Sequence, residues 1–219
     1  MIYFAATPIG NLEDITYRVI RVMKEVDCII CESVKKTKIL MDHYGIDKPL
    51  KSYNDFNKKT MTDWILHKLK EGKNFVFVTS AGSPLISDPG FFLVKNLIKE
   101  NLSFTSLPGP SAVINSLIIS GLPPDKFIFY GYLPKKKGKR RKVLESIKSE
   151  ERTCIIFESP KRVQRLLEEL KEILPEREIV LTREMTKIYE EVIRGIPGEI
   201  LDNMPNLKGE FVVLIRGAN

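Results

Sequence analysis

The sequence of 219 residues has only three cysteines and no long apolar run. Three cysteines cannot form the disulfide framework of a small secreted domain, so a reduced, cytoplasmic protein is expected. No apolar stretch approaches the roughly 20 residues that a membrane helix needs. The short apolar stretch that opens the chain, Met1 to Ala5, lacks the basic region that begins a signal peptide. The sequence therefore predicts no membrane partner and no signal peptide.

Several ligand-binding motifs are also missing. No G-x-G triplet, Gly-Lys-Ser/Thr pair or G-x-S-x-G elbow occurs, so the common dinucleotide, P-loop and hydrolase signatures are absent. Cys28 and Cys31 have C-x-x-C spacing, but in a strand residues three apart point to opposite faces. The only histidines, His43 and His67, lie in helix-like segments. We therefore expect no metal site.

What the chain does contain is a regular alternation of short apolar runs and helix-period segments. With 43% hydrophobic and 29% charged residues, it is not a disordered or collagen-like protein. The expected strands are 2–6, 28–31, 75–79, 104–107, 127–132, 154–157, 179–182 and 211–215. The expected helices are 14–26, 34–43, 58–72, 90–100, 110–120, 140–149 and 160–174. This alternation predicts an α/β fold.

The rhythm of the elements changes near the middle of the chain. Strand–helix repeats run to Leu107, whereas longer, hairpin-compatible strands follow the Gly121-Leu122-Pro123-Pro124 segment. We therefore predict two α/β domains, residues 1–112 and 113–219, the second with a mixed sheet.

The positive charge is confined to one segment. Lysine and arginine total 35 against 28 acidic residues, for a net charge of +7. Seven of the basic residues lie in one octapeptide: Lys135, Lys136, Lys137, Lys139, Arg140, Arg141 and Lys142. Such a block is either a solvated loop or a patch that binds nucleic-acid phosphates. We expect a flexible basic loop at 135–142 that guides RNA.

Three loops rich in glycine, proline and small polar residues each follow a predicted strand. They are residues 7–11, 80–90 and 108–112. In open α/β sheets, ligands bind at the carboxyl ends of strands, and small residues let the backbone approach a ligand closely. The loops are either tight turns or, as we expect from three together, a binding site. Glu158 and Glu184 follow later strands as candidates for proton handling.

These segments resemble a known family. The matching runs include Thr7-Pro8-Ile9-Gly10-Asn11-Leu12, Leu107-Pro108-Gly109-Pro110-Ser111-Ala112, Phe157-Glu158-Ser159 and Leu181-Thr182-Arg183-Glu184. From about residue 2 to 216 the chain is similar to the small-subunit ribosomal RNA (cytidine-2′-O-)methyltransferase I family, a branch of the tetrapyrrole (corrin/porphyrin) methylases.

The resemblance implies a tetrapyrrole-methylase-like α/β fold of two domains with a cofactor cleft between them, in a homodimer. It implies S-adenosyl-L-methionine as cofactor and methyl transfer to a cytidine ribose 2′-hydroxyl of 16S rRNA in the small ribosomal subunit. The implied cofactor contacts are Ile9, Gly10, Ala81, Gly82, Ser83, Ile86, Ser111, Ala112, Phe157, Arg183 and Gly209.

For catalysis, we expect Glu184 and Glu158 to accept or orient a proton, and Arg183 and Lys187 to position phosphate or ribose. The sequence departs from the family at Ser80, where an acidic residue is usual, and at Ser33 in a usual Glu-Asp-Thr-Arg run. It does not contain the C-terminal extension of longer members. Two alternatives stay open: a methylase of a tetrapyrrole or other small substrate, and a non-catalytic RNA-binding relative.

Overall fold

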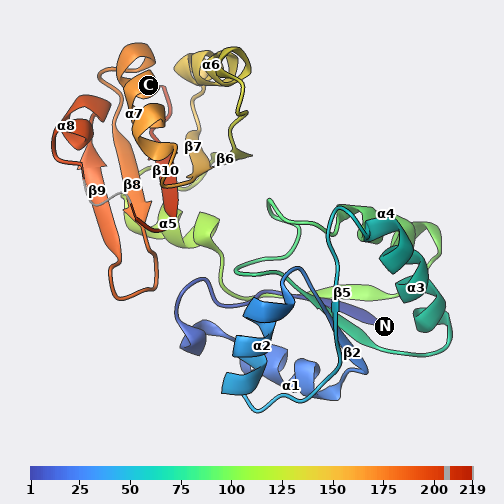
Figure 1. Ribbon diagram of the computed structural model, residues 1–219. Helices are drawn as coiled ribbons and strands as arrows, with labels where there is room; N and C mark the ends of the chain where they lie inside the picture. Colours follow the sequence, from blue (N-terminus) through green and yellow to red (C-terminus); the bar gives the residue numbers. More distant parts are fainter. Residues whose placement is uncertain (205–207, 219) are drawn as a thin grey trace. The chain divides into compact units, whose positions relative to one another are not determined.

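The computed structural model describes residues 1–204 and 208–218. The chain divides into two compact units, Met1–Ser111 and Ala112–Asn219, with the division beside the predicted boundary (Figure 1). Each unit is a sheet with helices on both faces. No helix of the described residues is long and apolar enough to cross a membrane.

The first unit contains a fully parallel sheet in the order β3-β2-β4-β1-β5. Every pair is parallel, so the carboxyl ends of all five strands lie at one edge of the sheet. The strands are β1 (Ile2–Ala5), β2 (Cys28–Cys31), β3 (Leu50–Ser52), β4 (Phe75–Val78) and β5 (Phe104–Leu107).

Four helices cover this sheet. The helices α1 (Tyr17–Glu25) and α2 (Val34–His43) pack on one face, and α3 (Lys58–Lys70) and α4 (Phe91–Lys99) on the other. A 3-10 turn, η1 (Leu12–Asp14), precedes α1. As expected for a strand, Cys28 and Cys31 belong to the cores on opposite faces.

The second unit contains a mixed sheet in the order β6-β7-β10-β8-β9. Only β6 and β7 pair in parallel, and the other neighbours are antiparallel. The strands are β6 (Phe127–Tyr132), β7 (Thr153–Glu158), β8 (Ile179–Arg183), β9 (Glu191–Gly195) and β10 (Phe211–Ile215).

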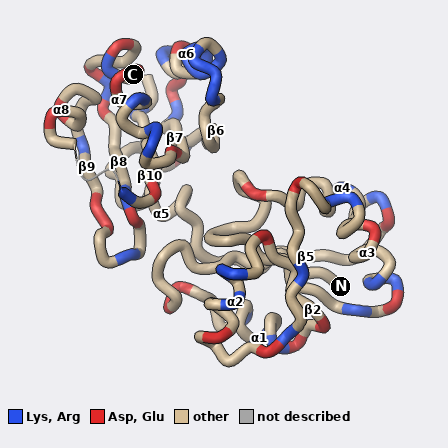
Figure 2. The backbone as a smooth tube through the Cα atoms, viewed as in Figure 1, with Lys and Arg blue, Asp and Glu red and all other residues tan. Residues whose placement is uncertain are grey.

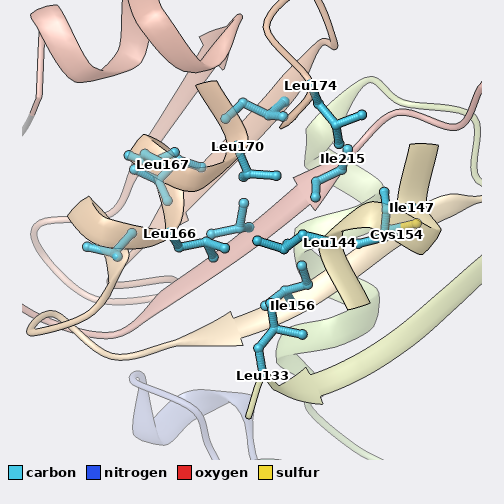
Figure 3. Packing of buried hydrophobic residues seen from close by; sticks show 14 of the residues in the cluster. Leu133, Leu144, Ile147, Cys154, Ile156, Leu166, Leu167, Leu170, Leu174 and Ile215 are labelled. Atoms are coloured by element: carbon cyan, nitrogen blue, oxygen red, sulfur yellow. The ribbon is translucent and has the colours of Figure 1, made fainter. Parts of the chain in front are cut away.

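One face of this sheet packs on α5 (Ala112–Ser120) and the other on α6 (Lys137–Ser146), α7 (Val163–Ile173) and α8 (Pro197–Asp202). A 3-10 turn, η2 (Ile147–Ser149), follows α6. Figure 3 shows how Leu144 of α6 and the leucines of α7 meet Ile156 and Ile215 of the sheet. The core thus fixes α6 against the strands.

The eight expected strands and seven expected helices are present, with three differences. The short strands β3 and β9 and helix α8 were not expected. The residues from Lys137 belong to helix α6, so the expected loop at 135–142 is wrong over most of its length. Helix α7 begins at Val163 rather than at 160, and a turn precedes it in which the backbone N–H of Arg162 donates to the carbonyl of Ser159 at 2.9 Å.

Candidate active site

The three glycine- and proline-rich loops lie next to one another in the first unit. They follow β4, β1 and β5, which are neighbours in the sheet. The strand order therefore gathers three loops that are far apart in the sequence at one edge. This is the position at which open α/β sheets bind ligands.

Hydrogen bonds join these loops. The backbone N–H of Thr7 donates to the carbonyl of Gly82 at 3.0 Å, and the N–H of Gly82 donates back to Thr7 at 2.9 Å. The hydroxyl of Ser83 donates to the carbonyl of Pro110 at 3.4 Å. The loops thus form one connected backbone surface, which reduces the ordering cost of binding a ligand.

The loop after β4 holds an unusual backbone. Leu85 and Ser87 have φ angles of 71° and 65°, a region that L-residues rarely adopt. At Gly82, φ is 75° and a Cβ atom would lie 3.3 Å from Cγ2 of Ile9, so a side chain here would press on the first loop. Such strained residues cluster at ligand-binding sites.

The predicted cofactor contacts of this unit lie on the joined loops. Ile9 and Gly82 are buried, Ala81 and Ser83 are half-buried, and Gly10 is exposed. Ile86 is 45% exposed, so its side chain is accessible to a ligand. Ser111 and Ala112 are half-buried at the junction of the two units. The small side chains of these loops fit a nucleoside-type cofactor such as S-adenosylmethionine, because they let the backbone approach a ligand closely.

An acidic pair at the same edge was missed by the sequence reasoning. Glu32 follows β2 and accepts a hydrogen bond from the hydroxyl of Ser80, which follows the neighbouring β4. Burial, and then the negative charge of Glu32, raise the pKa of Asp88 to about 6. Ser80 thus donates a hydrogen bond to Glu32. The acidic residue that is usual in the family at this position would instead add a third negative charge beside Glu32 and Asp88.

The predicted residues of the second unit meet at one end of its sheet. Phe211, the first residue of β10, pairs with Glu158 on one side and with Arg183 on the other. Arg183 forms an ion pair with Glu191 at 2.9 Å and donates to the carbonyl of Lys208 at 3.2 Å. The register therefore places the ends of β7 and β8 on either side of β10.

Glu184 is held in a network of its own. Its Oε1 accepts from Nζ of Lys187 at 2.8 Å and from the backbone N–H of Glu210 at 3.0 Å. Burial alone would raise the pKa of Glu184, but these donors outweigh it and the pKa is lowered. A carboxylate with a lowered pKa is a weak proton acceptor. The geometry fits the orienting role of Glu184 better than proton acceptance.

Gly209 is required by this network. Its φ is 109°, and a Cβ atom would lie 2.5 Å from Cγ of Glu184. Glu184 itself has a φ of 50°. A backbone strained in this way is kept only where its surroundings hold it firmly.

Glu158 is fully buried. Its Oε1 accepts from the backbone N–H of Ser159 at 2.8 Å and pairs with Nε of Arg162 at 3.3 Å. Its Oε2 has no hydrogen-bond partner among the described residues. Phe157 is half-buried and stacks edge-to-face on Phe129, with ring centroids 4.8 Å apart. Burial of the Glu158 side chain favours an orienting role here too.

The seven basic residues of the octapeptide have three different environments. Arg140 is buried and forms a bidentate pair with Glu169 of α7, with both contacts at 2.6 Å. It is therefore not available to RNA, and its predicted RNA contact is wrong. Arg141 is exposed and pairs with Glu145 and Glu172. The remaining five are exposed: Lys135, Lys136, Lys137, Lys139 and Lys142. Figure 2 shows this charge along α6.

No group of three or more His, Cys, Asp or Glu in the described ranges could hold a metal ion.

Comparisons with known proteins define the class. The profile of the family Tetrapyrrole (Corrin/Porphyrin) Methylases matches residues 1–200. The crystal structure of the methyltransferase CobJ covers 99% of this chain and 94% of its own, with a TM-score of 0.72 at 19% identity. A crystal structure of diphthine synthase covers 98% of this chain and 89% of its own, with a TM-score of 0.72 at 11% identity. At these identities the likeness shows the fold alone.

Relatives with similar sequences show to which branch of this methylase family the chain belongs. Ribosomal RNA small subunit methyltransferase I of Thermotoga maritima is 44% identical over 213 residues, which are 96% of this chain and 96% of the relative. The protein of the same name from Bacillus subtilis is 42% identical over 221 residues, covering 100% of this chain and 76% of the relative. The chain therefore belongs to the tetrapyrrole methylase family, and within it to the ribosomal RNA small subunit methyltransferase I family.

The predicted family and fold class are confirmed by these matches. The protein is a methyltransferase, and S-adenosylmethionine is its methyl donor, as expected for the family.

Proposed function

We propose that this protein transfers a methyl group from S-adenosylmethionine to a cytidine ribose 2′-hydroxyl of 16S rRNA. The observation that carries the proposal is the joined surface of three loops at the carboxyl edge of the first sheet. Kinship with ribosomal RNA small subunit methyltransferases supports RNA as the substrate. The cofactor, when bound, supplies an activated methyl group.

We propose that the backbone of the joined loops holds the cofactor, with Ile9, Gly10, Ala81, Gly82 and Ser83 as contacts. Ile86, Ser111, Ala112, Phe157, Arg183 and Gly209 complete the proposed set. Fixing the reactants in line is worth roughly 7–11 kcal/mol of the barrier when the geometry is good. The hydrogen bonds between the loops support this because they fix the backbone before binding.

We propose that Asp88 is the proton acceptor. It lies half-buried in the long loop after β4, and its pKa of about 6 is close to working pH, as an efficient general base requires. Glu158 and Glu184 orient their surroundings, since both are already engaged by donors. Arg183 and Lys187 then position ribose or phosphate.

The decisive experiment combines two measurements. Calorimetry should detect binding of S-adenosylmethionine, and labelled cofactor should methylate small ribosomal subunits from a strain that lacks this modification. Absence of binding would contradict the proposed transfer reaction and favour a non-catalytic RNA-binding relative. Binding with transfer to a tetrapyrrole but not to the subunit would favour the small-molecule methylase.

Single variants separate the roles. Asp88→Asn should lower the rate of transfer at least 100-fold, the usual scale of general base catalysis, while cofactor binding is kept. Asp63→Asn on α3 is the control, because this carboxylate lies outside the joined loops. An unchanged rate in Asp88→Asn would remove Asp88 from catalysis and leave the cofactor site intact.

A homodimer is part of the same proposal, because the family resemblance implies it. Light scattering after size exclusion should give twice the chain mass of 25.1 kDa. A mass of one chain would contradict it.

A further inference from the structure

We propose that five lysines at the start of helix α6 form a rigid surface that binds the phosphate backbone of RNA. The lysine surface consists of Lys135, Lys136, Lys137, Lys139 and Lys142. The inference rests on the proposed function, because RNA as substrate is part of it, and it identifies where the RNA backbone is bound.

These five charges are not neutralised by ion pairs within the part of the chain that the structure describes. All five side chains belong to exposed residues, and none takes part in an ion pair among the described residues. Arg141 of the same helix differs, since it pairs with Glu145 at 3.4 Å and Glu172 at 3.2 Å. Outside this octapeptide, basic and acidic residues balance at 28 each. The lysine surface therefore carries five of the seven excess positive charges.

The lysines lie around the N-terminal end of α6, where positive charge is unfavourable. The first turn of α6 contains no acidic residue, and its N-cap residue, Lys136, makes no side-chain capping bond. Lysines near the positive end of a helix dipole are unfavourable by up to about 1 kcal/mol each. A bound polyanion offsets this unfavourable interaction, because its negative charges are attracted both by the lysines and by the positive end of the helix dipole. The arrangement costs stability in the free protein and favours a phosphate-rich partner.

Helix α6 is fixed against α7 and the sheet of the second unit. Arg140 and Leu144 are buried, and the guanidinium of Arg140 makes two contacts of 2.6 Å with Glu169 of α7. Arg162 of the turn before α7 donates to the carbonyl of Leu133, just before the lysines, at 2.8 Å. Lys137, Lys139 and Lys142 therefore extend from an ordered helix, and Lys135 and Lys136 directly precede it, so RNA binding mainly orders their side chains. This replaces the flexible arm that composition alone suggests.

The test is the salt dependence of RNA binding. Fluorescence anisotropy with a labelled single-stranded RNA of mixed sequence should be measured for the wild type and for a variant with all five lysines changed to glutamine. Each phosphate contact contributes about 0.7 to the slope of log K against log salt for single strands. The variant should lose up to about 3.5 of this slope.

Two matched controls complete the test. Lys24→Gln/Lys99→Gln removes exposed charges from the first unit and should leave the slope nearly unchanged. Arg141→Gln should do the same, because this side chain is already paired. An unchanged slope in the five-lysine variant would overturn the proposal, as would an equal loss per charge in the Lys24/Lys99 control.

Cofactor calorimetry on the same variants separates this proposal from the proposed function. Intact cofactor binding with a reduced slope supports the lysine surface. If the wild type binds RNA with the expected slope but does not bind the cofactor, the proposed function fails and the lysine surface stands. If the five-lysine variant binds RNA like the wild type but an anionic protein less tightly, an acidic protein replaces RNA as the partner.

Discussion

The buried pair between Arg140 and Glu169 offers the sharpest test of the second unit. Both side chains are nearly inaccessible, at 3% and 10% exposure, and the two contacts are 2.6 Å long. Arg165 adds a third contact to Glu169 at 3.4 Å. Removal of one partner leaves a buried, unpaired charge, which costs about 3–5 kcal/mol.

We therefore expect Glu169→Gln to lower the free energy of unfolding of this unit by several kcal/mol. For a chain of this size each kcal/mol lowers Tm by about 2–4 °C, so the fall in Tm should be roughly 6–20 °C. Thermal and urea unfolding followed by circular dichroism would measure both quantities. Arg140→Met/Glu169→Leu should be far less destabilised, because no buried charge is left unpaired.

A control on the same helix decides the interpretation. Glu172 pairs with Arg141 at the surface, where its side chain is 65% exposed, so Glu172→Gln should cost at most about 1 kcal/mol. If Glu169→Gln costs no more than Glu172→Gln, the buried pair does not hold α6 and the rigidity of the lysine surface is refuted.

The pH dependence of this pair gives an independent check. Burial would raise the pKa of Glu169, but the hydrogen bonds and charges of Arg140 and Arg165 outweigh it, and the pKa is lowered below 4.5. The pair therefore stabilises the fold fully above about pH 4.5, and this contribution is lost as the pH falls below that value. Glu169→Gln should have a flatter stability profile in this acid range than the wild type.

Three further variants test the sites. Gly209→Ala should destabilise the second unit by about 2 kcal/mol or more, since its Cβ would meet Glu184; recovery with Glu184→Gly added, measured by urea unfolding, checks the cause. Asp88→Asn should raise stability at pH 7 by at most about 3 kcal/mol, and this gain should vanish below about pH 4, because the folded-state pKa of about 6 exceeds 3.8; no gain at pH 7 would contradict it. Gly82→Ala should weaken cofactor binding in calorimetry, because it strains the contact with Ile9; unchanged affinity would separate this contact from the site.

The helices and strands that the sequence predicted correctly are those whose apolar residues form a continuous run or a regular pattern. Strands β2 and β4 are buried at every position and consist entirely of apolar residues, so their burial could be predicted. In contrast, β3 has three residues of which none is buried, and β9 is an edge strand with only half-buried and exposed residues. Such strands are held by pairing with a neighbouring strand, β2 for β3 and β8 for β9, which apolar periodicity does not reveal.

The candidate site could likewise be predicted only in part from local sequence patterns. The three loops could be found from their glycines and prolines, but their contact depends on the order β4-β1-β5, which no local pattern specifies. The burial of Arg140 depends on Glu169, 29 positions away. The raised pKa of Asp88 likewise depends on its burial and then on Glu32, and two helices and two strands separate Glu32 from Asp88 in the sequence. The sequence therefore predicted which residue types each loop contains, but not which residues from other segments contact them in the fold.

The central place of β1 has a consequence for synthesis on the ribosome. Ile2 is the first residue of β1, yet its partners are Phe75 and Phe104. At about 5–20 residues per second, roughly 5–20 s pass before residue 107 has been added. Strand β1 therefore has both edges unpaired until β4 has been made, and one edge unpaired until β5 has been made; an unpaired apolar strand is a substrate for chaperones or for misassociation. In the second unit β8 is followed at once by its hairpin partner β9, so this pairing can form almost as soon as it is synthesised.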